Sequence, residues 1–473
     1  MDRLPLMITD RCLSESVREL VQFVDATYAT GAHPYSETLT MPRASSGPRP
    51  VNIIAAQDRI IYHALVERLR PALPPETRSS ENWSKFASVG VESRADAYIV
   101  EFDMASCYEY IDHVTLRREL ILQSMDVEGV TAVMEFLQSI FGRFRGLPQL
   151  IRSSDLLSDV YLEGIERELL RGGSTPARYA DDFKVVSENW GAANTIIETA
   201  ADVARDYGLI LSTGKTNIRK SVTVTEDRAR FIDFLVKYFN AAKGDLSRVD
   251  VFSDNYGDPE EVESTADSKE AYTVAFRRIL DEWYAAQVGH DSAVNIDFHA
   301  RHIPLALSWL RDADERIGDD ILDQIVFRAP LKLNSVLAYI RSRKEHLLNW
   351  DTILRLVSSE RQSPWARLWL LSAAQEEFQS GDVLPQPLLD WAQLQLGDKH
   401  ESVRAEAAWF LGSVGQLAAN DLRLLISSAT PLSLPALAAT TATSFAKTGM
   451  AKAIKGESPL TRAAYAWGEK HSA

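Results

Sequence analysis

Two adjacent carboxylates, Asp181 and Asp182, constrain this chain more than any other feature of its sequence. They lie between two segments of β-forming character, residues 176–178 and 183–186, which predict a hairpin with Tyr179-Ala180-Asp181-Asp182 as its tight turn. Neighbouring carboxylates repel each other unless a cation neutralises them. The pattern indicates either a solvated acidic turn, which is common, or a charged site built at the end of the hairpin.

A third carboxylate, Asp103, ends the apolar run of residues 97–102. On neighbouring strands, Asp103, Asp181 and Asp182 would form an oxygen-rich site for two Mg²⁺ ions, with Mn²⁺ as a substitute. Two such ions support in-line displacement at a nucleotide phosphate. We expect Asp103 and Asp181 to be the stronger ligands, and Asp182 to be a weaker ligand or an electrostatic support.

Further motifs surround these acids in a fixed order. They are Met41-Pro42-Arg43 with Arg49-Pro50, Gln57-Asp58-Arg59, Phe102-Asp103, Gly146-Leu147-Pro148-Gln149, Tyr179 to Asp182, Gly208-Leu209 with Lys215, and Phe231-Ile232-Asp233-Phe234-Leu235. Over roughly residues 40–240, the series resembles the fingers and palm of reverse transcriptases. In that resemblance, residues 231–235 correspond to the hydrophobic hairpin that follows the palm motifs.

The resemblance implies roles for charged side chains beside the carboxylates. Lys215 would protonate the pyrophosphate leaving group, and Arg43 and Arg49 would bind the incoming triphosphate. A guanidinium fork suits phosphate oxygens. The alternative for each of these three residues is an exposed surface charge.

The resemblance also assigns contacts with the nucleotide. Tyr108 would exclude a ribose 2′-hydroxyl, which implies deoxynucleotide substrates, and Gln149 would pack beside the incoming nucleotide. The family commonly has glycine after that glutamine, whereas this chain has Leu150. Glycine permits a close approach of backbone or ligand. We therefore expect template or nucleotide handling to differ here from the family pattern.

Composition bears on where in the cell the protein acts and on how it can hold a nucleic acid. The chain has 473 residues, 45% of them apolar, which supplies ample core for several domains. Two cysteines in unrelated contexts, no signal peptide and no long apolar run favour a cytoplasmic protein without a membrane segment. The net charge of -15 argues against a broad basic clamp, because counterion release is driven by Lys and Arg. A local groove that holds a short or self-made strand fits this charge better.

The predicted fold class is an α+β reverse-transcriptase fingers and palm followed by an all-α, HEAT-like helical-repeat domain. We place an N-terminal and fingers region at residues 1–96, the palm at 97–242, a linker at 243–267 and the helical repeats at 268–473. Residues 271–286 have the apolar spacing of an amphipathic helix. Ser-Pro pairs predict helix starts at Ser363 and Ser458, and residues 402–412 resemble a HEAT-type helix. The alternative is an irregular helical domain.

A palm followed by an acidic helical tail resembles bacterial antiphage-defence reverse transcriptases of the abortive-infection and unknown-group types. The resemblance implies terminal-transferase-like synthesis of single-stranded DNA from dNTPs, untemplated or poorly templated and sometimes protein-primed. Two other hypotheses stay open. One is RNA-templated cDNA synthesis with a partner non-coding RNA, and the other is an inactive scaffold.

Two sequence stretches bear on priming and assembly. Tyr28 and Tyr35 lie in the turn-prone residues 26–36 and are candidate protein primers, the alternative being packed aromatics. Residues 432–452 are rich in Ala, Leu and Thr with few charges, which makes a poor polar cap for a helical stack. We expect this stretch either to contact a second copy in a closed homo-oligomer or to pack inside its own domain.

Overall fold

The structure, a computed structural model, divides the chain into two compact units. It describes residues 4–31, 33–43, 47–91, 93–241, 249–251, 260–262, 269–289, 295–343, 346–360 and 362–471. Met1–Ile61 and Phe276–Ala473 form one unit, here the helical unit, and Tyr62–Ala275 form the other, here the sheet unit. The N-terminal residues therefore belong with the C-terminal helices. The predicted boundaries at residues 96, 242 and 267 stay a prediction about functional segments.

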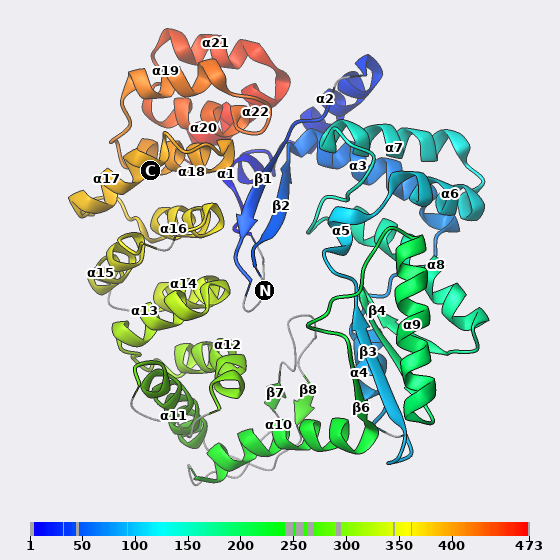
Figure 1. The fold of residues 1–473 in the computed structure, drawn as a ribbon. Coiled ribbons are helices and arrows are strands. Elements are labelled where there is room, and N and C mark those ends of the chain that lie inside the picture. Colours follow the sequence, from blue (N-terminus) through cyan, green and yellow to red (C-terminus); the bar gives the residue numbers. More distant parts are fainter. Residues whose placement is uncertain are drawn as a thin grey trace. The chain divides into compact units, whose positions relative to one another are not determined.

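A four-stranded antiparallel sheet is the centre of the sheet unit (Figure 1). Its strands are β3 (Tyr98–Asp103), β4 (Pro176–Tyr179), β5 (Asp182–Ser187) and β6 (Asn217–Lys220), in the order β4-β5-β3-β6. Phe102 and Phe183 are register partners on β3 and β5 and stack with their ring centroids 5.0 Å apart. Such cross-strand aromatic pairs stabilise a sheet and help to fix its register. The predicted strand and hairpin are confirmed.

Helices cover this sheet and fix the ends of its strands. The helices that pack against its strands are α4 (Ser80–Ser88), α8 (Arg152–Arg171), α9 (Trp190–Asp206) and α10 (Ser221–Ala241). Trp83 and Phe86 of α4 form a buried cluster with Tyr179 and Ala180. The remaining helices between β3 and β4 are α5 (Cys107–Tyr110), α6 (His113–Ser124) and α7 (Val127–Phe141). The catalytic turn predicted from the sequence is thus packed on a helix on its apolar side.

Residues 231–235 correct the sequence-based expectation. They lie inside the continuous helix α10, not in a hydrophobic hairpin. The apolar residues of this stretch recur at helical spacing, and no turn residue interrupts them. The predicted linker lies largely outside the described residues, apart from two short paired strands, β7 (Val249–Val251) and β8 (Glu260–Val262).

The helical unit begins with α1 (Ile8–Arg11), α2 (Val17–Thr30) and a hairpin of β1 (Ser36–Met41) and β2 (Arg49–Ile54). α3 (Ala56–Leu69) runs on into the sheet unit, to which η1 (Arg70–Ala72) belongs. Glu37 on β1 accepts hydrogen bonds from the backbone N–H groups of Glu401 (2.7 Å) and Ser402 (3.0 Å). These donors are at the start of α18 (Glu401–Ser413), where a helix leaves its N–H groups unpaired. The hairpin is therefore fastened to a helix more than 360 residues away in the sequence.

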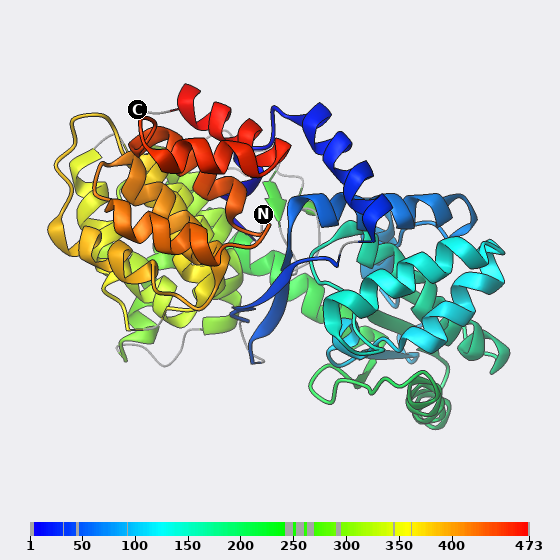
Figure 2. The same cartoon turned by 90° about the horizontal axis from the view of Figure 1, so that it is seen from above.

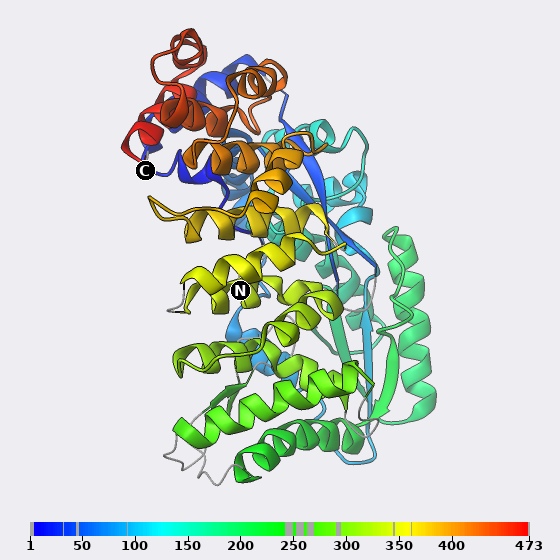
Figure 3. The ribbon, with the colours of Figure 1, turned by 90° about the vertical axis from the view of Figure 1, so that its left-hand side faces the viewer.

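The C-terminal helices stack in pairs (Figure 3). They are α11 (Lys269–Gln287), α12 (Ile296–Asp312), α13 (Asp319–Arg328), η2 (Pro330–Lys332), α14 (Leu333–Arg341), α15 (His346–Val357), α16 (Pro364–Glu377), α17 (Gln386–Gln395), α18, α19 (Ala419–Ser428), α20 (Leu434–Ser444), α21 (Gly449–Glu457) and α22 (Pro459–Lys470). From α12 to α22, each even-numbered helix packs against the next even-numbered one, as in a layered stack of helical pairs. The predicted helical tail is confirmed, and its HEAT-like character stays a prediction.

The helix starts predicted at Ser363 and Ser458 are confirmed. Ser363 and Ser458 are N-caps whose side chains accept hydrogen bonds from backbone N–H groups, and each precedes a proline. Ser402 is not the N-cap of its helix. His400 has that position, and Glu37 supplies the oxygen acceptors instead.

The Ala-rich stretch is not an exposed end of the stack. In α20, residues 435–442 are all buried, and the helix packs between α18 and α22 (Figure 2). The structure therefore favours packing within its own domain, and the surface expected for a second copy is absent from this helix. Among the described residues, no helix is long and apolar enough to cross a membrane.

Candidate active site

Asp103, Asp181 and Asp182 meet at one end of the sheet. Asp103 at the end of β3 is the register partner of Asp182 at the start of β5. One carboxylate oxygen from each of the three residues lies within 4.8 Å of the others. The antiparallel pairing of β3 with β5 is the reason, since it brings the end of one strand to the start of the next. The predicted convergence of the three acids is confirmed.

The turn that carries Asp181 has an unusual backbone. Tyr179 pairs with Asp182, so Ala180 and Asp181 form a two-residue loop. Ala180 has a φ of 54°, in the left-handed region that alanine seldom adopts. Two-residue hairpin loops require such a conformation, and glycine or asparagine usually supplies it. An alanine there must be held by surrounding contacts.

The electrostatics of the cluster favour a cation. Burial and the negative charges of Asp181 and Asp182 raise the pKa of Asp103, and Lys215 opposes that rise. The pKa of Asp182 is raised by burial and by Asp181. Within the described part of the chain, the Oδ1 atom of Asp103 is buried without a hydrogen-bond partner. Three close carboxylates with a buried, unsatisfied oxygen are a donor set that suits Mg²⁺ or Mn²⁺.

Lys215 lies beside the carboxylates, as the sequence predicted. Its Nζ atom is 3.3 Å from an oxygen of Asp103 and 3.4 Å from an oxygen of Asp182. The side chain is 51% exposed, so solvent reaches it. Its loop is fixed to β3, because the Ser212 backbone N–H donates to the Asp103 carbonyl over 2.7 Å. The position of Lys215 is set by the strand that presents Asp103.

Tyr108 is held through its hydroxyl group. The Arg78 guanidinium donates to this hydroxyl over 2.8 Å and Ser158 donates over 3.2 Å, while the hydroxyl donates to Asp155. Burial raises the pKa of Tyr108 well above its ordinary value, so the phenol stays neutral. A ring fixed at its far end is a rigid obstacle, as a sugar-selective residue needs to be.

Gln149 is half-buried on the segment before α8, and its neighbour Leu150 has a φ of 65°. This conformation is one that glycine adopts without strain. The backbone therefore keeps the conformation expected of the family's glycine although a leucine stands there. The leucine adds a side chain, and its backbone is strained.

The remaining predicted residues lie in the helical unit. Arg43 follows β1, and Arg49 begins β2 as the register partner of Met41. One hairpin thus carries both arginines. Their role at a triphosphate stays a prediction.

The two candidate primer residues differ in backbone structure. Tyr28 belongs to α2 and its side chain is 55% exposed, so the expectation of a turn is wrong for residues 26–30. Tyr35 lies just before β1 and is 45% exposed. Its backbone N–H donates to Asp58, and its carbonyl accepts from Ala55.

Several residues near the turn were missed by sequence reasoning. They are Thr77, Arg78, Asp155, Asp159 and Arg178. The signal was present on α8, where Asp155 and Asp159 recur four residues apart on a helix with many buried positions. A buried carboxylate needs partners, so Asp159 pointed to an internal network.

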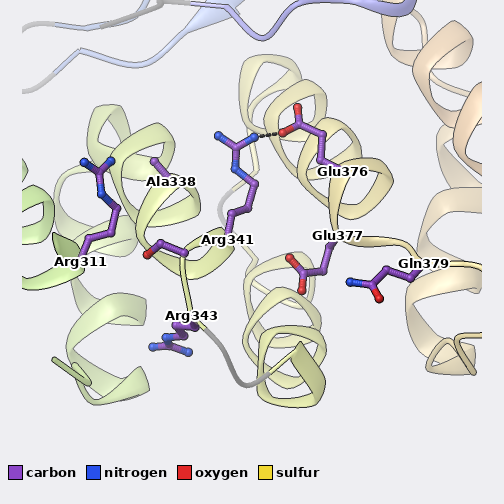
Figure 4. A pocket seen from close by; sticks show the side chains of 8 residues that line it. Arg311, Ala338, Arg341, Arg343, Glu376, Glu377 and Gln379 are labelled. Atoms are coloured by element: carbon purple, nitrogen blue, oxygen red, sulfur yellow. Dashed lines mark ion pairs between the residues drawn. The ribbon is translucent and has the colours of Figure 1, made fainter. Parts of the chain in front are cut away.

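A separate polar cavity of about 520 Å³ lies within the helical unit. Figure 4 shows Arg311, Arg341 and Arg343 among its lining residues, with Glu376 paired to Arg341. Arg343 pairs with Asp319 over 3.1 Å. Acidic neighbours neutralise these two guanidinium groups, and we assign no ligand to the cavity.

Comparisons with solved structures give low similarity over much of the chain. Telomerase from Candida albicans, in complex with a TWJ fragment of telomeric RNA, aligns at 11% identity with a TM-score of 0.31, over 80% of this chain and 64% of that chain. Apo telomerase from Candida tropicalis aligns at 10% identity with a TM-score of 0.30, over 82% and 73%. The chain thus spans less than two thirds of the Candida albicans protein.

A family model gives the more specific result. No curated protein matches the sequence. Residues 41–235 match the model described as reverse transcriptase (RNA-dependent DNA polymerase). The match contains the sheet with its three carboxylates, and it contains strand β2 and both arginines. Residues 41–235 are therefore a reverse-transcriptase-type polymerase domain.

Proposed function

We propose that this protein synthesises DNA from dNTPs by a two-metal mechanism and acts in bacterial antiphage defence. The observation that carries the catalytic part is the convergence of Asp103, Asp181 and Asp182 within 4.8 Å, with Lys215 in contact with two of them. In this proposal, the three carboxylates hold the ions. Bound divalent ions supply charge stabilisation for displacement at the nucleotide α-phosphate.

Other residues have roles in the same proposal. Lys215 holds a proton at Nζ for the pyrophosphate that leaves. Tyr108 occupies the space of a ribose 2′-hydroxyl, supported by the three groups that hold its own hydroxyl. Gln149 packs beside the nucleotide, and Arg43 and Arg49 bind its triphosphate.

The defence role rests on the resemblance of a palm with an acidic helical tail to abortive-infection enzymes. Untemplated or poorly templated synthesis fits two features of this chain, the strained Leu150 beside Gln149 and the net charge of -15. The proposed product is single-stranded DNA. A homo-oligomer and a cytoplasmic location belong to the same proposal, the first through the resemblance and the few charges of residues 432–452, the second through composition.

RNA-templated cDNA synthesis is the second candidate, because the matched family model describes an RNA-dependent DNA polymerase. One incubation separates the candidates. Purified protein receives Mg²⁺ and labelled dNTPs, with and without added RNA, and an Asp181→Ala variant serves as the control. Product without RNA supports untemplated synthesis, and RNA-dependent product supports the second candidate. No product in either case contradicts both and favours a scaffold.

Protein priming has its own test. Product DNA is digested with nuclease, and the protein is searched by mass spectrometry for a nucleotide on tyrosine. We expect an adduct on Tyr28 or Tyr35, since both are exposed. Product that migrates free of protein after denaturation contradicts priming by the protein.

A further inference from the structure

The residue before the catalytic aspartates is held at both of its backbone polar groups. The Ala180 N–H donates to the Thr77 hydroxyl over 3.2 Å, and the Ala180 carbonyl accepts from Arg178 over 3.3 Å. Both partners are side chains from outside the two-residue loop. A backbone conformation that alanine seldom adopts is thus fixed from two sides.

Asp159 connects these two contacts. Its Oδ1 atom accepts from the Thr77 hydroxyl and from Arg178, each over 2.9 Å. Its Oδ2 atom accepts from the Thr77 backbone N–H over 3.1 Å. One carboxylate therefore orients both groups that hold Ala180.

Burial makes this arrangement rigid. The side chains of Asp159 and Arg178 are 1% and 4% exposed. Charge-assisted hydrogen bonds in a water-excluded site are strong and directional. Arg178 is further fixed by Glu166 over 3.0 Å. The Thr77 hydroxyl accepts one hydrogen bond and donates another, because a single hydroxyl oxygen can do both.

We infer that Asp159 and Thr77 are positioning residues that hold Ala180 in its left-handed conformation and thereby aim Asp181 and Asp182 at the metal site. Neither residue touches the reacting atoms. Their effect passes through the backbone of the turn, because a change in φ at Ala180 redirects both following side chains. This inference rests on the proposed polymerase activity and assigns the geometry of the same site.

The test uses Thr77, because its side chain is half-buried, whereas Asp159 and Arg178 are almost fully buried. Thr77→Val keeps the shape and removes the hydroxyl, whereas Thr77→Ser keeps the hydroxyl. Thr131→Val is the matched control, since that exposed hydroxyl only donates to a carbonyl within α7. We would measure kcat and KM for dATP, Mn²⁺ affinity by electron paramagnetic resonance, and Tm.

For Thr77→Val we expect kcat to fall about 10-fold or more, with KM for dATP within about 2-fold, because a misaimed ligand affects chemistry more than nucleotide binding. Mn²⁺ affinity should fall about 5-fold. Loss of a hydrogen bond to a metal ligand lowers metal affinity by about 10-fold or more. Thr77 acts on the backbone of the turn and not on a ligand directly, so the expected loss is smaller. Thr77→Ser and Thr131→Val should stay within about 2-fold of wild type in each quantity.

Wild-type kcat and Mn²⁺ affinity in Thr77→Val would overturn the inference while leaving the polymerase intact. An equal loss in Thr77→Ser would also overturn it, because packing of the methyl group would then explain the effect. If wild type makes no DNA, the proposed function fails and Mn²⁺ affinity alone decides the positioning role. Should Thr77→Val not fold, Thr77→Ala removes the same hydroxyl without adding a methyl group against Ala180.

Discussion

Asp103 and Asp182 are direct register partners on two antiparallel strands of one sheet. Like charges placed opposite each other destabilise a sheet. Here the Nζ atom of Lys215 lies within 3.4 Å of both residues, and Asp181 adds a third carboxylate. A fold keeps such a cluster when a cation completes it, so the pairing is the strongest structural argument for metal-dependent chemistry.

Asp181→Ala should abolish nucleotide incorporation, by on the order of 10³-fold or more, without lowering Tm. Removing one carboxylate from three relieves repulsion, so the fold loses nothing. The exposed Asp202, which pairs with Arg205 on α9, offers Asp202→Ala as a control that should keep its activity. The measurement is dNTP incorporation together with thermal unfolding. Normal incorporation by soluble Asp181→Ala would remove this residue from the catalytic site.

Tyr108→Ala should admit ribonucleotides by opening the space beside the 2′-carbon. We expect the preference for dATP over ATP in kcat/KM to fall about 100-fold. Tyr108→Phe keeps the ring and removes only the contacts of the hydroxyl with Arg78, Asp155 and Ser158, so its preference should fall less than about 5-fold. Wild-type protein that uses ATP as readily as dATP would show that the residue is not a sugar gate.

Leu150→Gly should be more stable than Leu150→Ala by about 1 kcal/mol, the reverse of the usual order of these residues. Both changes remove the leucine side chain, and only glycine adopts a φ of 65° without strain. The difference in stability between the two variants therefore measures the free energy of backbone strain at this position. Urea unfolding of the two variants measures it, and a less stable glycine variant would contradict strain at this position.

Glu406 should make the stability of the helical unit depend on pH. Burial raises its pKa from 4.5 to about 7, despite the nearby Arg11 guanidinium and the hydrogen bond from the Ile8 N–H. The folded state then binds a proton that the unfolded state has released, so stability falls as pH rises from about 4.5 to about 7. The loss is on the order of 3 kcal/mol.

Glu406→Gln removes this titration and keeps an oxygen acceptor for Ile8. Between pH 5 and 8, the unfolding free energy of wild type should fall by on the order of 3 kcal/mol more than that of Glu406→Gln. Denaturant unfolding at several pH values measures the difference. Parallel pH profiles of the two proteins would show that Glu406 does not titrate in this range.

Features that depend on neighbouring residues could be predicted from the sequence. The hairpin around Asp181, the strand that ends at Asp103 and the helix starts at Ser363 and Ser458 all appear in the structure. Each is determined by local periodicity, turn chemistry or capping, which need only a few consecutive residues. The resemblance to reverse transcriptases added the role expected of Lys215 beside the carboxylates.

One local expectation was wrong, and one choice between two alternatives could not be made, where competing patterns were similar in strength. Residues 231–235 are helical instead of a hairpin, and α20, for which contact with a second copy and packing inside its own domain were both open, is buried between two helices. An apolar pentapeptide fits a strand or a helix, and an Ala-rich helix fits an interior or an interface. Burial by the rest of the chain decides between such alternatives, and no short window contains that information.

The sequence by itself determined the kind of chemistry, because the acidic pair, the third aspartate and the lysine are chemical groups that the residue types specify directly. Only the tertiary structure decided how those groups are held. The contacts of Thr77 with Asp159 and with Ala180, and of Glu37 with the start of α18, join residues 82 to 365 positions apart. Such contacts form only once the chain has folded, because their energy depends on distance in space and on burial, not on separation along the chain.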